Sequence, residues 1–268
     1  MMKNKRIVLI GAGNVAHHLA PALLRAGAGL CQIYSRSPES ARNLGIETGV
    51  GYTADIRAVY PDCDIYIFCV TDDALPTLCK NIRIHKEALL LHTSGCLSMD
   101  IFRPYTSRYG VLYPLQTFTG NMDLDFMKIP LCIEAATPQL LEEVRELGRM
   151  LSSRVEEIPS EKRRVLHVAA VFANNFVNHL YGIAGNILEK EGLDFTLLRP
   201  LISETAHKVM TVNPDLAQTG PARRGDRSII EMHKAILEHD SRLLNLYTLL
   251  SDSIWETVHK GEENRNGR

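Results

Sequence analysis

The chain lacks the features that define several broad classes of protein. It contains no apolar run close to the roughly 18 to 20 residues that a membrane-spanning helix needs. Its formal net charge is −1, so no excess of basic residues favours a nucleic acid as the main partner. We therefore expect a soluble protein that binds neither a membrane nor a nucleic acid.

The chain also lacks any Cys-x-x-Cys pair, although it has six cysteines. This absence argues against a zinc site and against a redox dithiol, and most of the cysteines lie in apolar segments, where reduced buried thiols are usual. The N-terminus starts basic and turns apolar, but its apolar run is too short for a signal peptide and no cleavage-like site follows. We expect no metal, a mature N-terminus and a cytoplasmic location.

Length and composition are those of a globular protein with one large or two modest domains: 268 residues, 45% apolar and 23% charged. In the first half, short apolar runs alternate with helical patterns. Several runs are apolar on consecutive positions, as expected for strands covered on both faces. The predicted strands are residues 6–10, 30–34, 64–70, 88–93, 110–115 and 129–135. We predict an α/β fold with a doubly wound parallel sheet, the Rossmann arrangement.

From residue 138 onward the pattern is helical, with apolar residues repeating at three- and four-residue spacing and almost no strand-like alternation. A boundary near residue 158, in the stretch "VEEIPSEKRR", separates the two patterns. The sequence thus predicts an α/β domain over residues 1–158 and an all-α domain over residues 159–268.

The stretch "RIVLIGAGNVA" places G-x-G-x-x-A between the first strand and a helix. Gly11 permits the tight turn, Gly13 lets a pyrophosphate approach the backbone, and Ala16 lets the helix pack close to the strand. The N–H groups of the first helical turn, at Asn14, Val15 and Ala16, point at the pyrophosphate. We predict that these residues bind a dinucleotide; the alternative is a glycine turn that binds nothing.

The residues after the second strand indicate which dinucleotide is bound. An NAD site carries Asp or Glu here, whereas this chain has Ser35, Arg36 and Ser37. Arg36 can pair with a 2′-phosphate and the two hydroxyls can donate to it, so we predict NADP. The alternative is a solvated loop in which Ser37 caps the next helix.

A third group of candidate cofactor residues follows the strand at 64–70. Val70, Thr71 and Asp72 stand where ligands of open α/β sheets collect, at the carboxyl end of the strand. The alternative is that Asp72 or Asp73 only caps the helix that follows.

Five motifs together resemble a bacterial family of Rossmann-like proteins with a helical C-terminal domain of unknown function, assigned as NADP oxidoreductases. They are "GAGNVA", "HTSG" (92–95), "YPLQTF" (113–118), "HVAAVFANNFVNHL" (167–180) and "TGPARRGD" (219–226). The layout more distantly resembles the superfamily of ketopantoate reductase, pyrroline-5-carboxylate reductase, prephenate dehydrogenase and 6-phosphogluconate dehydrogenase. The resemblance implies a Rossmann domain that holds NAD(P) and a helical domain that supplies substrate contacts and the dimer interface. It names no substrate.

The chain departs from that superfamily at one point. Several members carry a catalytic Lys and an Asn one helical turn apart, and although Asn174 or Asn175 matches the Asn, Ala170 and Val171 stand one turn earlier. The Lys-based mechanism is therefore not transferred.

The same helix offers His167, Asn174 and Asn178, which α-helical spacing places within roughly 20° of one direction. Three polar residues on an otherwise apolar helix face either a site or polar groups of a neighbouring helix. We expect Asn178 to contact the substrate.

His92 and Ser94 follow a predicted strand and should emerge at the carboxyl edge of the sheet, near the nicotinamide. Histidine exchanges protons near neutral pH, so His92 or His167 is the candidate acid, with Ser94, Gln116 and Asn174 orienting the substrate. The alternative for His92 is a structural histidine that bridges the strand end and a loop.

Arg223 and Arg224 lie in a turn leading into a helix and suit an anionic substrate or the cofactor phosphates. They equally suit bulk solvent, and only the resemblance favours a function for them.

These observations predict a cytoplasmic NADP-dependent oxidoreductase that reduces a small anionic keto or imino substrate in the cleft between its domains. The long, mostly apolar helices of the second domain predict a homodimer. The alternative is a non-catalytic Rossmann protein that senses a nucleotide or binds a partner, which the missing Lys favours.

Overall fold

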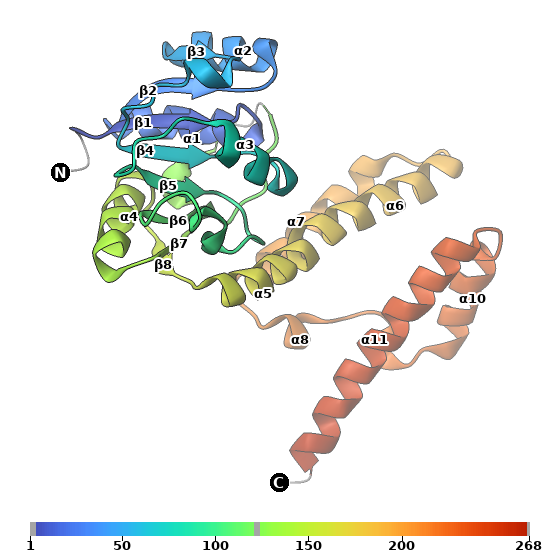
Figure 1. Cartoon of the computed structure of the whole chain (residues 1–268). Helices are drawn as coiled ribbons and strands as arrows, with labels where there is room; N and C mark the ends of the chain where they lie inside the picture. Colours follow the sequence, from blue (N-terminus) through green and yellow to red (C-terminus); the bar gives the residue numbers. More distant parts are fainter. Residues whose placement is uncertain (1–3, 121–123, 267–268) are drawn as a thin grey trace. The chain divides into compact units, whose positions relative to one another are not determined.

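The computed structural model describes residues 4–120 and 124–266, and in the last helix the side chains to residue 258. The chain forms two compact units, Met1–Leu180 and Tyr181–Arg268. The first unit contains the sheet and the start of the helical region (Figure 1).

The sheet of the first unit has eight strands among the described residues, in the order β3-β2-β1-β4-β5-β6-β7-β8. They are β1 (Arg6–Ile10), β2 (Gly29–Tyr34), β3 (Gly51–Thr53), β4 (Ile65–Phe68), β5 (Leu89–His92), β6 (Tyr109–Pro114), β7 (Leu131–Ala135) and β8 (Val155–Glu157). The order 3-2-1-4-5 is that of the Rossmann fold, with its switch point between β1 and β4.

Helices cover both faces of this sheet (Figure 1). They are α1 (Asn14–Arg25), α2 (Pro38–Thr48), α3 (Leu75–Asn81) and α4 (Pro138–Leu151), with short 3-10 turns η2 (Ile56–Ala58), η3 (Asp72–Ala74), η4 (Met99–Phe102) and η5 (Phe126–Lys128). Along β1, Ile7 and Leu9 join the core beneath α1 and α4, while Val8 joins the core beneath α3. This alternation between two buried faces explains why the strand is apolar at consecutive positions.

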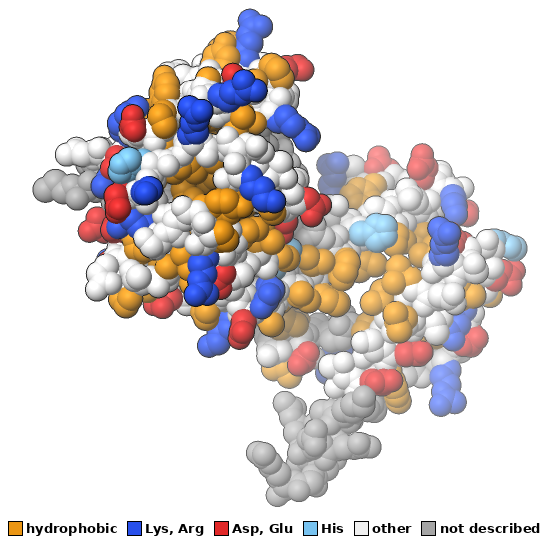
Figure 2. Space-filling view, viewed as in Figure 1, with side chains coloured by type: hydrophobic (Ala, Val, Ile, Leu, Met, Phe, Trp, Pro, Cys, Tyr) orange, Lys and Arg blue, Asp and Glu red, His pale blue; other side chains and the backbone are white. Residues whose placement is uncertain are grey.

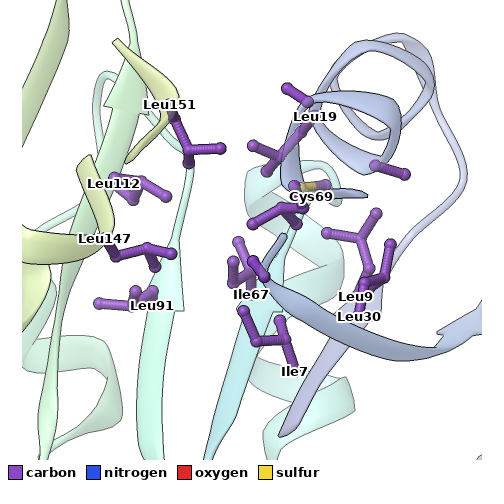
Figure 3. Close-up of a cluster of buried hydrophobic side chains, with 14 of the residues drawn as sticks. Ile7, Leu9, Leu19, Leu30, Ile67, Cys69, Leu91, Leu112, Leu147 and Leu151 are labelled. Atoms are coloured by element: carbon purple, nitrogen blue, oxygen red, sulfur yellow. The ribbon is translucent and has the colours of Figure 1, made fainter. Parts of the chain in front are cut away.

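The larger of the two cores packs helix side chains against the centre of the sheet. Figure 3 shows Leu19 of α1 on one side and Leu147 and Leu151 of α4 on the other, all directed at strand side chains such as Ile67 and Leu91. Each of these side chains is at most 2% exposed, so the strands that carry the site are held on a rigid base.

The predicted Rossmann fold is confirmed, and each of the six predicted strands is present, but the predicted all-parallel sheet is wrong at one pair. β7 runs antiparallel to β6, with Val111 opposite Glu134 and Tyr113 opposite Cys132. The connection between β6 and β7 contains no α-helix among its described residues, so it is not a βαβ crossover. The sequence patterns also missed β3 and β8, which have three residues each.

The helical region begins close to the predicted boundary. β8 ends at Glu157 and α5 begins at Ser160, whereas the two compact units divide after Leu180. The helices are α5 (Ser160–Ala170), the π-helix η6 (Val171–Phe176), α6 (Val177–Lys190), η7 (Phe195–Leu198), α7 (Arg199–Val209), α8 (Pro214–Ala217), α9 (Pro221–Arg224), α10 (Arg227–Leu237) and α11 (Ser241–Asn266). That residues 1–158 bind the cofactor and residues 159–268 contact the substrate and form the dimer interface stays a prediction.

These helices expose many large apolar side chains, shown in orange in Figure 2. Met210, Met232 and Trp255 are 82%, 52% and 43% exposed in the single chain. Within the described part of the chain, no helix is long and apolar enough to cross a membrane.

Candidate active site

The turn between β1 and α1 has the backbone that the glycine motif predicts. Gly11 has φ +116°, and a Cβ there would lie 2.2 Å from the Cys69 carbonyl oxygen, just beyond the end of β4. Only glycine satisfies both restrictions. Ala16 is fully buried against the sheet, as close packing of the helix on the strand requires.

The N-terminus of α1 is open, as a bound pyrophosphate needs. Gly13 is the N-cap residue, no side chain caps the helix, and a Cβ on Gly13 would meet nothing within 4 Å. The first intrahelical bond to Gly13 is donated by His17, so the N–H groups of Asn14, Val15 and Ala16 are left to an outside acceptor. These residues fit the phosphates of a dinucleotide. The Asn14 side chain donates to the Phe118 carbonyl, 3.0 Å away.

At the end of β2, two of the three predicted phosphate-binding residues also shape the loop. Ser37 accepts a hydrogen bond from the Ser40 N–H as the N-cap of α2, and Ser35 Oγ accepts from the Ser37 N–H. Arg36 is exposed, and no hydrogen bond or ion pair to its side chain is present in the described residues. Its guanidinium is therefore available to a 2′-phosphate.

At the end of β4, the helix-cap alternative is not supported. Thr71 is the N-cap residue of η3 and Ala74 that of α3, and neither turn has a side-chain cap. Val70 and Asp72 are half-buried and Thr71 is exposed. These residues lie at the switch-point edge beside Gly11, the place where Rossmann folds in general bind dinucleotides.

His92 has the environment of a structural histidine. It is fully buried, its Nδ1 accepts from the Ser94 N–H at 3.2 Å, and its Nε2 makes no hydrogen bond within the described residues. Burial, and then the nearby Arg163 charge, lowers the pKa of His92 to about 3. Because the ring is neutral at physiological pH, the geometry favours the structural alternative over a proton donor.

Ser94 has one hydrogen atom left to donate. Its Oγ accepts from the N–H groups of Cys96 and Leu97, both at 3.0 Å. With both acceptor positions used, the hydroxyl hydrogen remains for another partner. A half-buried hydroxyl in this state can orient a substrate oxygen.

His167 lies at the same edge of the sheet, paired with Tyr113 near the end of β6. The Tyr113 hydroxyl is 3.1 Å from His167 Nδ1, and a Cβ on Gly95 would lie 2.6 Å from that nitrogen. Tyr113 was missed as a site residue, although the rule that selected His92 and Ser94, proximity to the carboxyl end of a strand, applies to it equally.

A buried ion pair fixes α5 to the sheet and to the loop after β5. Arg163, which is 0% exposed, lies 2.6 Å from Glu134 of β7 and donates to the Leu97 carbonyl. Ser160 N–H and Oγ donate to the same carboxylate at 2.9 and 2.6 Å. The basic stretch around Arg163 does not indicate from sequence that this side chain is buried. Glu134, a single carboxylate in an apolar strand, does indicate a buried partner of opposite charge.

The predicted polar stripe on the helix is wrong, because the helix is not α-helical throughout. The π-helix η6 widens one turn, which rotates Asn174 and Asn178 relative to His167. Both asparagines are exposed, and neither side chain has a hydrogen bond within the described residues. Their roles at the site stay predictions.

The other predicted substrate residues have local partners. Gln116 is exposed and its Oε1 accepts from the Thr117 N–H at 2.8 Å. In the second unit, Arg223 donates to the Gln218 carbonyl at 2.6 Å and Arg224 pairs with Asp226 at 2.7 Å.

In the described residues, no group of three or more His, Cys, Asp and Glu side chains is placed to hold a metal. The edge of the sheet instead combines an open helix N-terminus with a hydroxyl donor and an imidazole. This combination suits a phosphorylated cofactor and a proton transfer.

Comparisons with known proteins agree with this description. A model described as "NADP oxidoreductase coenzyme F420-dependent" matches residues 6–94, and a domain of unknown function, DUF2520, matches residues 129–254. A Bacteroides fragilis protein assigned as an NADP oxidoreductase is 42% identical, with 96% of this chain and 100% of that chain covered and a TM-score of 0.91. No curated protein matches.

Two more distant structures share the fold alone. A Thermotoga maritima protein is 24% identical with a TM-score of 0.80, over 94% of this chain and 99% of that chain. The 1-pyrroline-5-carboxylate reductase of Streptococcus pyogenes is 14% identical with a TM-score of 0.63, over 97% of this chain and 98% of that chain.

Proposed function

Because the chain belongs to the family of NADP oxidoreductases with a C-terminal DUF2520 domain, we propose that it reduces a C=O or C=N bond of a small anionic substrate. The observation that carries the proposal is the open N-terminus of α1 on the same sheet edge as Ser94 and His167. A phosphorylated cofactor and a proton donor are the two elements that such a reduction requires.

NADP is the cofactor of this family. In the proposed site the first-turn N–H groups of α1 hold its pyrophosphate, and Arg36, with the Ser35 and Ser37 hydroxyls, holds its 2′-phosphate. Val70, Thr71 and Asp72 line the switch-point edge beside it. When bound, NADPH supplies the hydride.

The protein's own part is to orient the substrate and to supply a proton. We assign the proton to His167 rather than His92, since the burial of His92 keeps that ring neutral. The Ser94 hydroxyl orients the reacting oxygen or nitrogen. Gln116, Asn174 and Asn178 are proposed to contact the rest of the substrate.

Arg223 and Arg224 remain proposed partners for the anionic group of the substrate. The side chain of Arg224 is 61% exposed even with Asp226 beside it, so it keeps donors for a carboxylate or phosphate.

We also propose that the protein is a homodimer in the cytoplasm. Apolar side chains such as Phe172, Leu201 and Met210 are more than 60% exposed, and a second copy that buries them removes an unfavourable contact with water. All six cysteines are free thiols, which fits a reducing compartment. Sedimentation at several concentrations tests the dimer.

The first experiment is a fluorescence titration of the wild-type protein and Arg36→Ala with NADPH and NADH. We expect NADPH to bind more tightly than NADH, and Arg36→Ala to weaken NADPH binding tenfold or more, about 1.4 kcal/mol, with little effect on NADH. Arg83→Ala is the matched control, because Arg83 is exposed and follows the end of α3, at the opposite edge of the sheet. Equal affinities for the two nucleotides would refute the NADP site.

Turnover is then tested by NADPH oxidation with keto acids, imino acids and coenzyme F420, which the description of the N-terminal domain names. His167→Ala should lower kcat by about 10²-fold or more and leave NADPH affinity unchanged. If NADPH binds and no acceptor is reduced, the non-catalytic nucleotide sensor becomes the better account, in line with Ala170 and Val171 where several superfamily members carry Lys.

A further inference from the structure

Tyr113 and His167 form a hydrogen-bonded pair that only the fold brings together. They are 54 residues apart in sequence, one near the end of β6 and the other on α5, with 3.1 Å between the hydroxyl and Nδ1. Their rings meet edge to face, with centroids 6.2 Å apart at 66°. The contact therefore combines a polar bond with ring packing.

The backbone after β5 lies close to both members of the pair. A Cβ on Gly95 would lie 2.6 Å from His167 Nδ1 and 3.0 Å from Tyr113 Cζ. The neighbouring residue is Ser94, whose hydroxyl hydrogen is available to a ligand. The pair therefore lies against Gly95, the residue next to the one that we propose to orient the substrate.

The helix that carries His167 is also held by Arg163. Arg163 stands one helical turn before His167, and its contacts with Glu134 and the Leu97 carbonyl join α5 to β7 and to the loop that carries Gly95. A buried, hydrogen-bonded ion pair of this kind restricts the orientation of the elements that it joins. Arg163 thus fixes the position of the helix that carries His167, and Tyr113 fixes the orientation of its imidazole ring.

The direction of the hydrogen bond follows from the burial of Tyr113. The side chain is only 8% exposed, and burial raises the pKa of its hydroxyl to about 12, so the phenol keeps its proton. In the described residues, His167 is its hydrogen-bond partner. The hydroxyl therefore donates to Nδ1, which leaves the imidazole hydrogen on Nε2.

We propose that Tyr113 is a positioning residue that holds His167 as the Nε2–H tautomer, so that Nε2 is the atom that gives a proton to the reduced substrate. This inference rests on the proposed function, because the proton is used in the reduction that we propose there. The substrate carbon gains the hydride that converts NADPH to NADP⁺, and the substrate oxygen or nitrogen takes the Nε2 proton. The Tyr113 hydroxyl keeps its proton and its hydrogen bond to Nδ1, and Nε2 regains a proton from water.

The test is a ¹⁵N NMR titration of His167 in the full chain with NADP⁺ bound, comparing wild type with Tyr113→Phe. We expect the wild type to show the Nε2–H tautomer. When Nδ1 is protonated, the Tyr113 hydroxyl can no longer donate a hydrogen bond to it, so this hydrogen bond opposes protonation. Removing the hydroxyl should therefore raise the titration midpoint of His167 by about half to one pH unit, which is a three- to tenfold change in the protonation equilibrium. His167→Gln identifies the resonances.

Tyr105→Phe is the matched control, because Tyr105 is 39% exposed and has no side-chain hydrogen bond within the described residues. It should leave the midpoint of His167 unchanged. An Nδ1–H tautomer in the wild type, or the same midpoint in Tyr113→Phe, would overturn the proposal even if that variant were less stable.

Kinetics separate this inference from the proposed function. With a reducible substrate, Tyr113→Phe should lower kcat by about tenfold or more, leave KM and NADPH affinity within twofold, and shift the pH profile with the NMR midpoint. An unchanged pH profile would refute the positioning role. If no substrate is reduced while the NMR result holds, the proton-donating role fails and the tautomer assignment stands.

Discussion

Gly95→Ala tests whether the Tyr113–His167 pair depends on the close approach of the loop after β5. The new methyl group would lie 2.6 Å from His167 Nδ1 and 2.9 Å from its Cγ. The ring must retreat by about 0.8 Å to reach an ordinary contact distance, which stretches a 3.1 Å hydrogen bond beyond bonding range. Overpacking of this kind costs about 1 to 3 kcal/mol, and the lost hydrogen bond about 1 kcal/mol.

The assay is thermal unfolding followed by circular dichroism. At about 2 to 4 °C per kcal/mol, Tm should fall by about 4 to 16 °C, and the tautomer preference of His167 should be lost. Gly182→Ala is the control, because Gly182 lies inside α6 with nothing within 4 Å of its Cβ, and this substitution should raise stability by about 0.5 to 1 kcal/mol. An unchanged Tm and an unchanged His167 spectrum in Gly95→Ala would refute the reasoning.

Three further predictions concern residues that hold the site. His92 has a pKa of about 3 when folded and an ordinary value of 6.5, so the unfolded chain binds the extra proton and stability falls as pH drops below 6.5. Lowering the pH from 6.5 to 5 should reduce the free energy of unfolding, measured by urea denaturation, by up to about 2 kcal/mol. His92→Gln should remove most of this pH dependence. Arg163→Leu leaves Glu134 buried without its cation and should destabilise the protein by about 3 to 5 kcal/mol, whereas the added change Glu134→Leu should recover part of the loss. Gly11→Ala places a Cβ 2.2 Å from the Cys69 carbonyl oxygen, on a backbone with positive φ. It should lower the free energy of unfolding by at least about 2 kcal/mol and abolish NADPH binding. A stable variant with normal affinity for NADPH would contradict this interpretation of the turn.

The glycine turn of the proposed cofactor site could be predicted from sequence because its determinants are local. Gly11 and Ala16 lie within one strand-turn-helix segment, and each has a backbone or packing requirement that its residue type reveals. The side chain of Arg36 follows the next strand, where the topology of a parallel sheet brings it to the same edge.

The chemical part of the site could not be predicted in the same way. The spacing of His167 and Asn174 was interpreted with α-helical geometry, but the π-helical turn between them depends on interactions that no residue pattern specified. His92 was a candidate acid because its position was right, and only its complete burial beside Arg163 reveals that the ring stays neutral.

The sequence by itself determined the Rossmann order of elements and the glycine turn, because hydrophobic periodicity and backbone restrictions act over neighbouring residues. Tertiary structure alone decided the antiparallel β7, the burial of Arg163 against Glu134 and the pairing of Tyr113 with His167. These contacts join strands and helices distant in sequence, and their energies depend on burial and on the distances between side chains, which no single segment of the chain specifies.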